Sequence, residues 1–148
     1  MDLKALNPNG NAFLVSFTKA KKTYKKFISP TLNDLGLTHN EFEILVFLQE
    51  NLEYNTAKDI VKLRGFSKAY VSKAVEPLLD KELITIEIDK EDRRCQHLLL
   101  TEKSEPLLDI LLKMQREFID IITDGIDKED IKTYINVMDS FYKNSKKR

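Results

Sequence analysis

The sequence predicts a mainly α-helical protein with one small β-hairpin, and three observations lead to this prediction. Apolar residues recur at helical spacing through most of the chain. The segment Ile84 to Ile88 alternates apolar and polar residues and is rich in β-branched side chains, which is typical of a half-buried strand. The segment Asp89 to Arg94 is entirely charged, and Gln96 to Leu100 then returns as a second strand. Such a charged loop between two strands is usually a solvated hairpin tip.

The first helix is expected over residues 11–29. Its apolar residues follow steps of four and three, which form one continuous seam. We expect Ser29 and Pro30 to break this helix, with a short continuation from Pro30 to Leu35 that ends at Gly36. The seam consists of Phe13, Phe17, Ala20, Tyr24 and Phe27.

Polar residues mark where the later helices begin. Thr38 to Glu41 has the pattern of a capping box and predicts a second helix. Thr56 is expected to cap a short third helix that ends before Gly65, and the helix from Ser67 would follow after a tight turn. Thr101 and Asp127 are expected to cap a fifth and a sixth helix, separated by a turn at residues 124–125.

Positive charge is concentrated in the middle of a chain whose formal net charge is zero. From Lys58 to Lys73 there are five basic residues and one acidic residue, whereas Glu76 to Glu82 has three acidic residues and one basic residue. A helix that begins at Ser67 therefore has a basic, hydroxyl-rich start and an acidic end. Side chains of this kind neutralise DNA phosphates and reach base edges. On its own, this pattern also fits a solvated helix whose lysines confer solubility.

The hairpin follows the basic helix at the spacing of a winged helix-turn-helix. Its loop has the pattern Asp89-x-x-Asp92-Arg93-Arg94, and Leu100-Thr101-Glu102-Lys103 follows. With the order of helices before it, this pattern resembles the MarR family of winged-helix transcription regulators. The resemblance covers nearly the whole chain in element order, but only the segment Thr56 to Leu100 in motif detail.

The resemblance implies a role in binding double-stranded DNA. Asp92 would orient the wing, Arg94 with Arg93 would reach into the minor groove, and Ser67 to Lys73 would read the major groove. The expected DNA contacts are Thr56, Lys58, Lys62, Ser67, Lys68, Tyr70, Ser72, Lys73, Lys90, Asp92, Arg93 and Arg94. The alternative is a winged-helix protein-interaction module, in which Lys68, Lys73 and Arg94 meet an acidic protein partner.

Three residues depart from the family pattern. Glu82 stands where a helix-ending glycine is common, so a left-handed cap there would be formed by a less favourable residue, or would be replaced. Pro77 stands where a basic residue is frequent, and we expect it to kink the helix near Lys73 to Pro77 and to remove one phosphate contact. Ser104 replaces a usual glycine, with no consequence that follows from the sequence.

The carboxyl-terminal helices have more apolar surface than one lobe can cover. One row of apolar residues follows coiled-coil spacing and consists of Leu107, Leu111, Met114, Phe118 and Ile121. A second row, Leu108, Leu112, Ile119 and Ile122, runs beside it. We expect the first and the last two helices to intertwine with those of a second copy; the alternative is an intramolecular helical hairpin that packs on the first helix. A two-fold dimer would hold two recognition helices about 34 Å apart and would favour a palindromic site. The expected dimerisation residues are Phe13, Leu107, Leu111, Met114, Phe118, Ile121, Ile131, Ile135 and Met138.

This interpretation divides the chain into three parts: an amino-terminal arm and dimerisation helix (1–37), a winged helix-turn-helix lobe (38–100) and carboxyl-terminal dimerisation helices (101–148). The family resemblance further implies a repressor that is released by a small-molecule effector. The effector would lie between the dimerisation helices and the lobe, although core packing is the alternative role for each aromatic residue there. Its predicted boundary is Phe17, Tyr24, Phe42 and Phe118.

Other classes of protein are disfavoured. No apolar run is long enough to span a membrane, and the first residues lack the apolar core of a signal peptide, so we expect a cytoplasmic protein. Four glycines, none at the spacing of a phosphate-binding loop, and the lack of a nucleophile motif predict no enzymatic activity and no cofactor. His39, His97 and Cys95 make a poor metal set. Cys95 is either a redox-active thiol beside two arginines or a small residue at the start of a strand.

Overall fold

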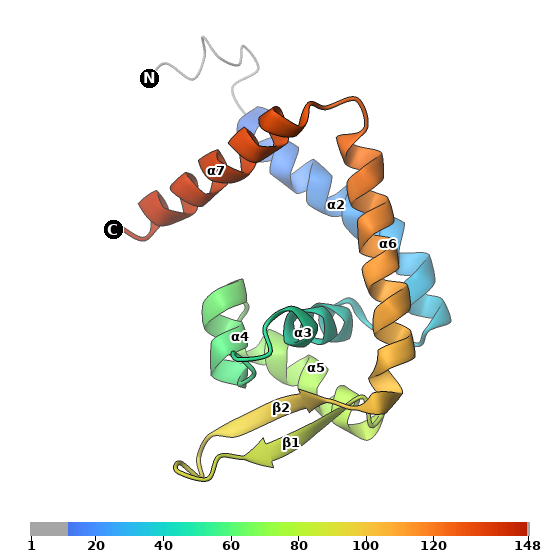
Figure 1. Cartoon of the computed structure of the whole chain (residues 1–148), viewed down its shortest axis with the longest axis vertical. Helices are drawn as coiled ribbons and strands as arrows, with labels where there is room; N and C mark the ends of the chain where they lie inside the picture. Colours follow the sequence, from blue (N-terminus) through green and yellow to red (C-terminus); the bar gives the residue numbers. More distant parts are fainter. Residues whose placement is uncertain (1–11, 148) are drawn as a thin grey trace. The chain divides into compact units, whose positions relative to one another are not determined.

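The structure is a computed structural model that describes the backbone of residues 12–147 and the side chains of residues 15–147. Its elements follow the expected order, in which helices precede and follow a two-stranded hairpin along the chain (Figure 1). The chain separates into one unit up to Met114 and a second from Gln115 onward, and each is described by itself. The side chain of Phe13, one of the expected dimerisation residues, lies outside the described part.

The first described helix, α2 (Ala12–Asp34), continues through Pro30, so the expected break at residues 29–30 is wrong. Ile28 and Leu32 lie on either side of Pro30, and both are buried in the same core. Their burial offsets a proline penalty of about 3 kcal/mol, so the helix continues past Pro30. The helix ends as expected at Gly36, which has a φ of 67°. The Leu37 N–H donates to the Leu32 carbonyl, as in a Schellman motif.

Three helices form the centre of the first unit. Helix α3 (His39–Glu50) begins with the expected capping box between Thr38 and Glu41, and most of its side chains are buried. Helix α4 (Ala57–Arg64) begins with a second capping box between Thr56 and Asp59. Helix α5 (Lys68–Asp80) is capped by the Ser67 hydroxyl, which accepts the Tyr70 N–H. Short-range patterns therefore place the start of each helix.

Helix α5 is continuous through Pro77 and ends on a left-handed residue. Glu82 has a φ of 57°, the only positive value at a described residue other than glycine. The Glu82 N–H donates to the Leu79 carbonyl and the Leu83 N–H to the Leu78 carbonyl, which completes a Schellman motif. The expectation that a residue less suited than glycine forms this cap is confirmed. The kink near Pro77 stays a prediction.

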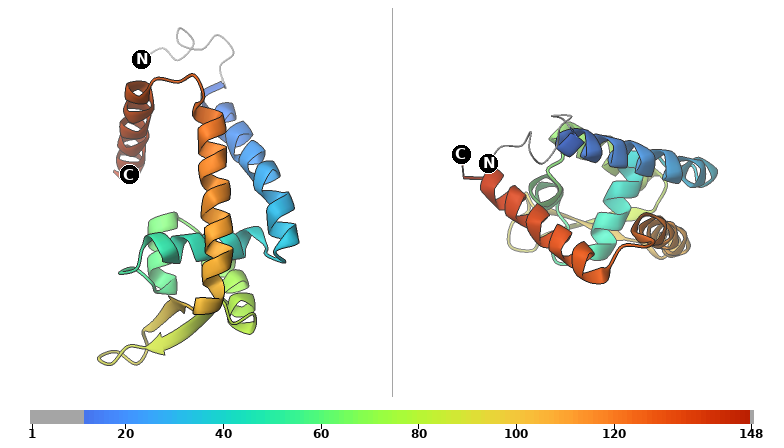
Figure 2. Two further views of the ribbon diagram at one scale, coloured as in Figure 1. Left: turned by 45° about the vertical axis from the view of Figure 1, so that its right-hand side comes forward. Right: turned by 90° about the horizontal axis from the view of Figure 1, so that it is seen from above.

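The hairpin pairs β1 (Ile84–Ile88) with β2 (Gln96–Leu100) in antiparallel register, from Ile84 opposite Leu100 to Ile88 opposite Gln96. Only Ile84 is buried in β1, so the expectation of a half-buried strand holds at its first residue alone. The hairpin extends beyond the helices of the first unit, and its outer residues leave the core (Figure 2). A single bridge between Thr56 and His97 joins β2 to the start of α4.

The chain then enters a 3₁₀ turn (Glu102–Ser104) and helix α6 (Glu105–Thr123). Thr101 was expected to cap this helix, but its hydroxyl makes no capping bond. It donates instead to the Glu82 carbonyl at 2.7 Å. Helix α7 (Lys128–Ser145) is capped by Asp127, as expected.

The core of the first unit contains buried apolar residues from α2, α3, α4, α5, the hairpin and the start of α6. Leu108, Leu111 and Met114 belong to this core. Leu111 and Met114, two of the expected dimerisation residues, are therefore buried within one chain. The apolar row of α6 thus changes environment along its length, from this core to the exposed Ile121.

Candidate nucleic-acid interface

The exposed start of α5 borders a groove that it shares with α4. Lys68 and Ser72 of α5 lie across this groove from Lys58 of α4. The groove has a volume of about 400 Å³, and apolar side chains, Val61 and Val71 among them, form part of its lining. Lys73 is exposed on the same helix. This arrangement presents ammonium and hydroxyl groups above a shallow apolar floor.

A second groove, of about 350 Å³, lies between the start of α4 and the hairpin loop. Its lining includes Thr56 and Lys58 on one side and Asp92 and Arg94 on the other. Because Ala57 and Lys58 line both grooves, the groove beside Lys68 adjoins the groove beside Arg94 at the start of α4. Positive charge from three separate segments therefore gathers along one surface, which suits a polyanion.

The other residues expected to contact DNA lie outside the linings of these two grooves. Lys62 is exposed on α4, and Lys90 and Arg93 are exposed on the hairpin loop. Tyr70 is half-buried, with its ring 4.4 Å from the Phe66 ring, centroid to centroid. Burial, and after it the charge of Glu43 on α3, raises the pKa of the Tyr70 phenol. Tyr70 thus packs against Phe66, near enough to Glu43 of α3 for that charge to act on its phenol.

Two aspartates organise the hairpin loop. One carboxylate oxygen of Asp89 accepts the N–H groups of Glu91 and Asp92, each at 2.8 Å. The Asp92 carboxylate accepts the Arg94 N–H at 3.0 Å, so it holds the backbone from which Arg94 extends. The backbone hydrogen bond from Asp92, the side-chain bond to His97 and the backbone bond from Glu91 lower the pKa of Asp89 to about 2. Sequence reasoning assigned an orienting role to Asp92 but missed Asp89.

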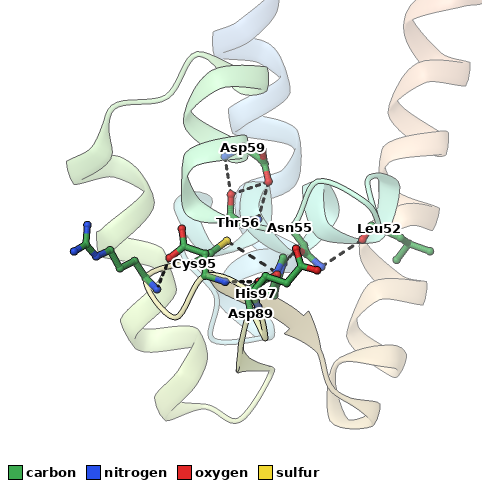
Figure 3. A network of polar contacts seen from close by, with 10 residues as sticks. Leu52, Asn55, Thr56, Asp59, Asp89, Cys95 and His97 are labelled. Carbon is green, nitrogen blue, oxygen red and sulfur yellow. Dashed lines mark hydrogen bonds and ion pairs between the residues drawn. The ribbon is translucent and has the colours of Figure 1, made fainter.

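His97 connects this loop to the start of α4 (Figure 3). Its Nε2 lies 3.0 Å from Asp89 Oδ2, and its Nδ1 lies 2.6 Å from Asn55 Oδ1. Asn55 immediately precedes the α4 cap, and its carbonyl accepts the Leu98 N–H at 2.8 Å. Sequence reasoning considered His97 only as a metal ligand and gave no role to Asn55, because no sequence signal relates two residues 42 positions apart.

The expected effector boundary is only partly assembled in one unit. Phe42 is fully buried in the core, and its ring lies 6.4 Å from that of the partly buried Tyr24, centroid to centroid. Phe17 is partly exposed, and Phe118 belongs to the second unit. The burial of Phe42 supports the alternative that this residue packs the core. The effector pocket stays a prediction.

The described residues contain no group of three or more histidine, cysteine or acidic side chains that could hold a metal ion. Cys95 is partly buried, with its Sγ 4.0 Å from His97 Nε2. None of the described helices is both long and apolar enough to cross a membrane.

The comparisons with known proteins agree with this geometry. The family model described as MarR family matches residues 35–94. An uncharacterized HTH-type transcriptional regulator of Staphylococcus aureus strain MSSA476 is 27% identical over 135 residues, which covers 88% of this chain and 90% of the relative.

Solved structures share the fold. A putative MarR family regulator from Listeria monocytogenes, complexed with 26mer DNA, has a TM-score of 0.82 and 18% identity over 88% of this chain and 87% of its own. BpsR of Bordetella bronchiseptica has a TM-score of 0.71 and 19% identity over 85% of this chain and 95% of its own. The matched segment, residues 35–94, contains the helices and most of the hairpin that form the two grooves. Residues 35–94 match the MarR family model, and the chain shares the winged helix-turn-helix fold of the MarR regulators of known structure.

Proposed function

We propose that this protein is a DNA-binding transcription regulator of the MarR family, a repressor that binds a palindromic operator as a homodimer in the cytoplasm and leaves it when a small effector binds. The observation that carries the proposal is the pair of adjoining grooves that share Lys58. One groove adjoins the start of the recognition helix α5, and the other adjoins the hairpin loop. A duplex laid across both would meet cations from α4, α5 and the wing together.

The chemistry of the two grooves fits two parts of a duplex. Exposed residues at the start of α5, Lys68, Ser72 and Lys73, have donors for base edges and phosphates in the major groove. Arg94 extends from a loop that Asp89 and Asp92 hold in shape, so it is suited to the adjacent minor groove. Lys58 lies between them, where it would neutralise a phosphate of the intervening backbone.

The homodimer is supported by the apolar surface of the second unit. Helix α7 has no buried side chain among its described residues. Ile121 and Ile135 are 62% and 59% exposed, and Ile119, Ile122, Tyr134 and Tyr142 are exposed as well. Monomeric proteins rarely expose so many large apolar side chains together. A second copy of the same chain would cover them and would give two recognition helices for two half-sites.

The effector is supported by one structural relative. In BpsR of Bordetella bronchiseptica, 6-hydroxynicotinic acid regulates DNA binding. A small molecule that binds between the dimerisation helices and the lobe would act here by changing the separation of the two recognition helices. Our candidate boundary remains Phe17, Tyr24, Phe42 and Phe118, with Phe42 as its most buried member.

A footprint of the DNA upstream of the protein's own gene tests the repressor. We expect protection of two half-sites with centres about 10 base pairs apart, or a multiple of that spacing. Affinity for DNA should fall as a power of the salt concentration. Arg94→Ala should reduce the magnitude of the exponent by about 0.9 if one phosphate contact is lost. Lys132→Ala, which removes an exposed lysine from α7, is the matched control. An unprotected upstream region, or equal exponents for the two variants, would contradict the proposal.

A further inference from the structure

Helix α5 is held at both of its ends by the first turn of α3, the helix that lies against it (Figure 1). In the first turn of α5, the Tyr70 carbonyl accepts a hydrogen bond from Asn40 Nδ2 at 3.2 Å. Directly after α5, Lys81 Nζ donates to both carboxylate oxygens of Glu41, each at 2.8 Å. Two neighbouring residues of α3 therefore hold the beginning and the end of the recognition helix.

Chemistry fixes which group donates in each of these contacts. A backbone carbonyl only accepts and an ammonium group only donates, so Asn40 faces Tyr70 with its amide nitrogen and Lys81 donates to Glu41. The Thr38 N–H donates to Glu41 Oε2 as well, at 2.7 Å. Only 1% of the Glu41 side chain is exposed, so this carboxylate depends on its protein donors rather than on water.

The first turn of α3 is in turn fixed to the end of α2. Leu37, between the left-handed Gly36 and the cap residue Thr38, is buried. The Leu37 N–H donates to the Leu32 carbonyl at 2.9 Å, and the Gly36 carbonyl accepts from Lys81 Nζ at 2.7 Å. The recognition helix is therefore held against α3 and against the end of α2, the predicted dimerisation helix.

Contacts at both ends of a helix fix the direction of its axis, whereas a single contact leaves the helix free to tilt. In the proposed homodimer, the direction of α5 relative to α2 determines how far apart the two recognition helices lie and at what angle they meet DNA. One additional base pair between two half-sites moves them apart by about 3.4 Å and rotates one by about 35° around the duplex. Two rigidly held recognition helices can then reach both half-sites only if the DNA deforms.

We propose that Asn40, Glu41 and Lys81 are positioning residues that hold the recognition helix in the direction that sets the half-site spacing of the operator. This inference rests on the proposed function, because it concerns the operator that this function requires. The three residues act through α5 and do not contact DNA themselves. When either end of α5 is loosened, the protein should accept more than one spacing, while its contacts with each half-site stay the same.

The test measures affinity for the footprinted upstream fragment and for two copies of it, with one base pair inserted or removed between the half-sites, at constant ionic strength. We expect the wild type to bind the natural spacing at least about tenfold more tightly than either copy. In Lys81→Met and in Asn40→Ala this ratio should fall to about threefold or less, because a tilted helix spares the DNA part of its deformation. Lys81→Arg retains a cation that pairs with Glu41 and should keep the wild-type ratio.

The ratio of affinities separates positioning from stability. A variant that is partly unfolded loses the same factor in affinity for every fragment, so its ratio between spacings does not change. Lys103→Met is the matched control, because Lys103 forms an exposed ion pair of 3.5 Å with Glu82, the residue that follows Lys81. This control should retain the wild-type ratio. Asn40→Ala leaves the Glu41 pair in place, so it provides an independent check if Lys81→Met folds poorly.

The possible outcomes distinguish this inference from the proposed function. A wild-type ratio in either Lys81→Met or Asn40→Ala would overturn the inference and leave the proposed function intact. Equal affinity of the wild type for all three fragments would also overturn the inference alone. A failure of the wild type to bind any of the fragments would instead overturn both.

Discussion

Lys81 Nζ lies 2.8 Å from both carboxylate oxygens of Glu41, whose side chain is only 1% exposed. The same ammonium group donates to the Gly36 carbonyl at 2.7 Å. Lys81 directly follows α5, Glu41 is in the first turn of α3, and Gly36 ends α2. One lysine therefore joins the end of the recognition helix to the corner between the first two described helices.

We expect Lys81→Met to destabilise the protein by about 2 kcal/mol. Removing one partner from a buried pair costs about 3 kcal/mol or more, and the value is reduced here because Lys81 is 38% exposed. Glu41→Gln in the same chain should recover much of the loss, since it removes the unpaired charge and glutamine still completes a capping box. Urea unfolding at neutral pH measures the free energies.

Lys143→Met is the matched control for Lys81→Met. Lys143 pairs with Asp139 four residues earlier on α7, and both side chains are more than half exposed. Exposed pairs of this kind contribute about 0.5 kcal/mol or less. Equal losses for the two lysine variants would show that the Lys81 pair has no special role in stability.

Glu82→Gly should stabilise the protein by about 0.5 to 1 kcal/mol. Glutamate at a φ of 57° is in a left-handed backbone conformation that is unfavourable for it and favourable for glycine. The greater conformational freedom of glycine in the unfolded chain offsets part of the stability that the substitution gains. The ion pair to Lys103 that the change removes is 3.5 Å long and exposed, so it contributes little. The measurement is the thermal midpoint of unfolding.

Glu76→Gly, inside α5, is the control and should lower stability by about 1 kcal/mol. Destabilisation by both changes would contradict the assigned role of the left-handed turn.

Local sequence signals correctly predicted the starts of α3, α4, α5 and α7. Thr38 with Glu41, and Thr56 with Asp59, form the expected capping boxes because each pattern is complete within four residues. For Glu82, the family pattern left two alternatives, a left-handed cap or its replacement, and the structure has the left-handed conformation. These features depend on neighbours in the chain, so their physical cause is visible in the sequence.

Features that depend on tertiary packing were not predictable in the same way. Pro30 does not break α2, because Ile28 and Leu32 are buried in the same core, and their burial could not be read from local spacing. The contact between His97 and Asn55 joins segments whose separation only the fold determines. The candidate DNA surface was predictable in its residue types, but the shared position of Lys58 in both grooves required the structure.

Acid should weaken the folded state through Asp89. Its pKa is lowered to about 2 in the folded chain, below the ordinary value of 3.8, so its stabilising contribution is complete above about pH 4 and is lost as pH falls through about 2. Asp89→Asn should therefore reduce the loss of stability over this interval, as measured by urea unfolding at closely spaced pH values. Glu91→Gln changes a neighbouring exposed side chain that makes no hydrogen bond among the described residues. If the free energy of unfolding of Asp89→Asn depends on pH in the same way as that of Glu91→Gln, ionised Asp89 does not stabilise the folded state.

The exposed apolar residues of α7 are expected to form the dimer interface. Ile135 of α7 is 59% exposed in the isolated chain, and a homodimer would bury it. Ile135→Glu would place an unpaired charge in that interface, so we expect the dimer dissociation constant to rise by at least about a hundredfold. Thr133→Glu introduces the same charge on the opposite side of the helix, about 160° away at 100° per residue, and should leave the dimer intact. Sedimentation equilibrium measures the dissociation constant of each variant. A wild-type chain that is monomeric at micromolar concentration would show that two copies do not associate. A dimer that tolerates glutamate at position 135 would show that another surface joins them.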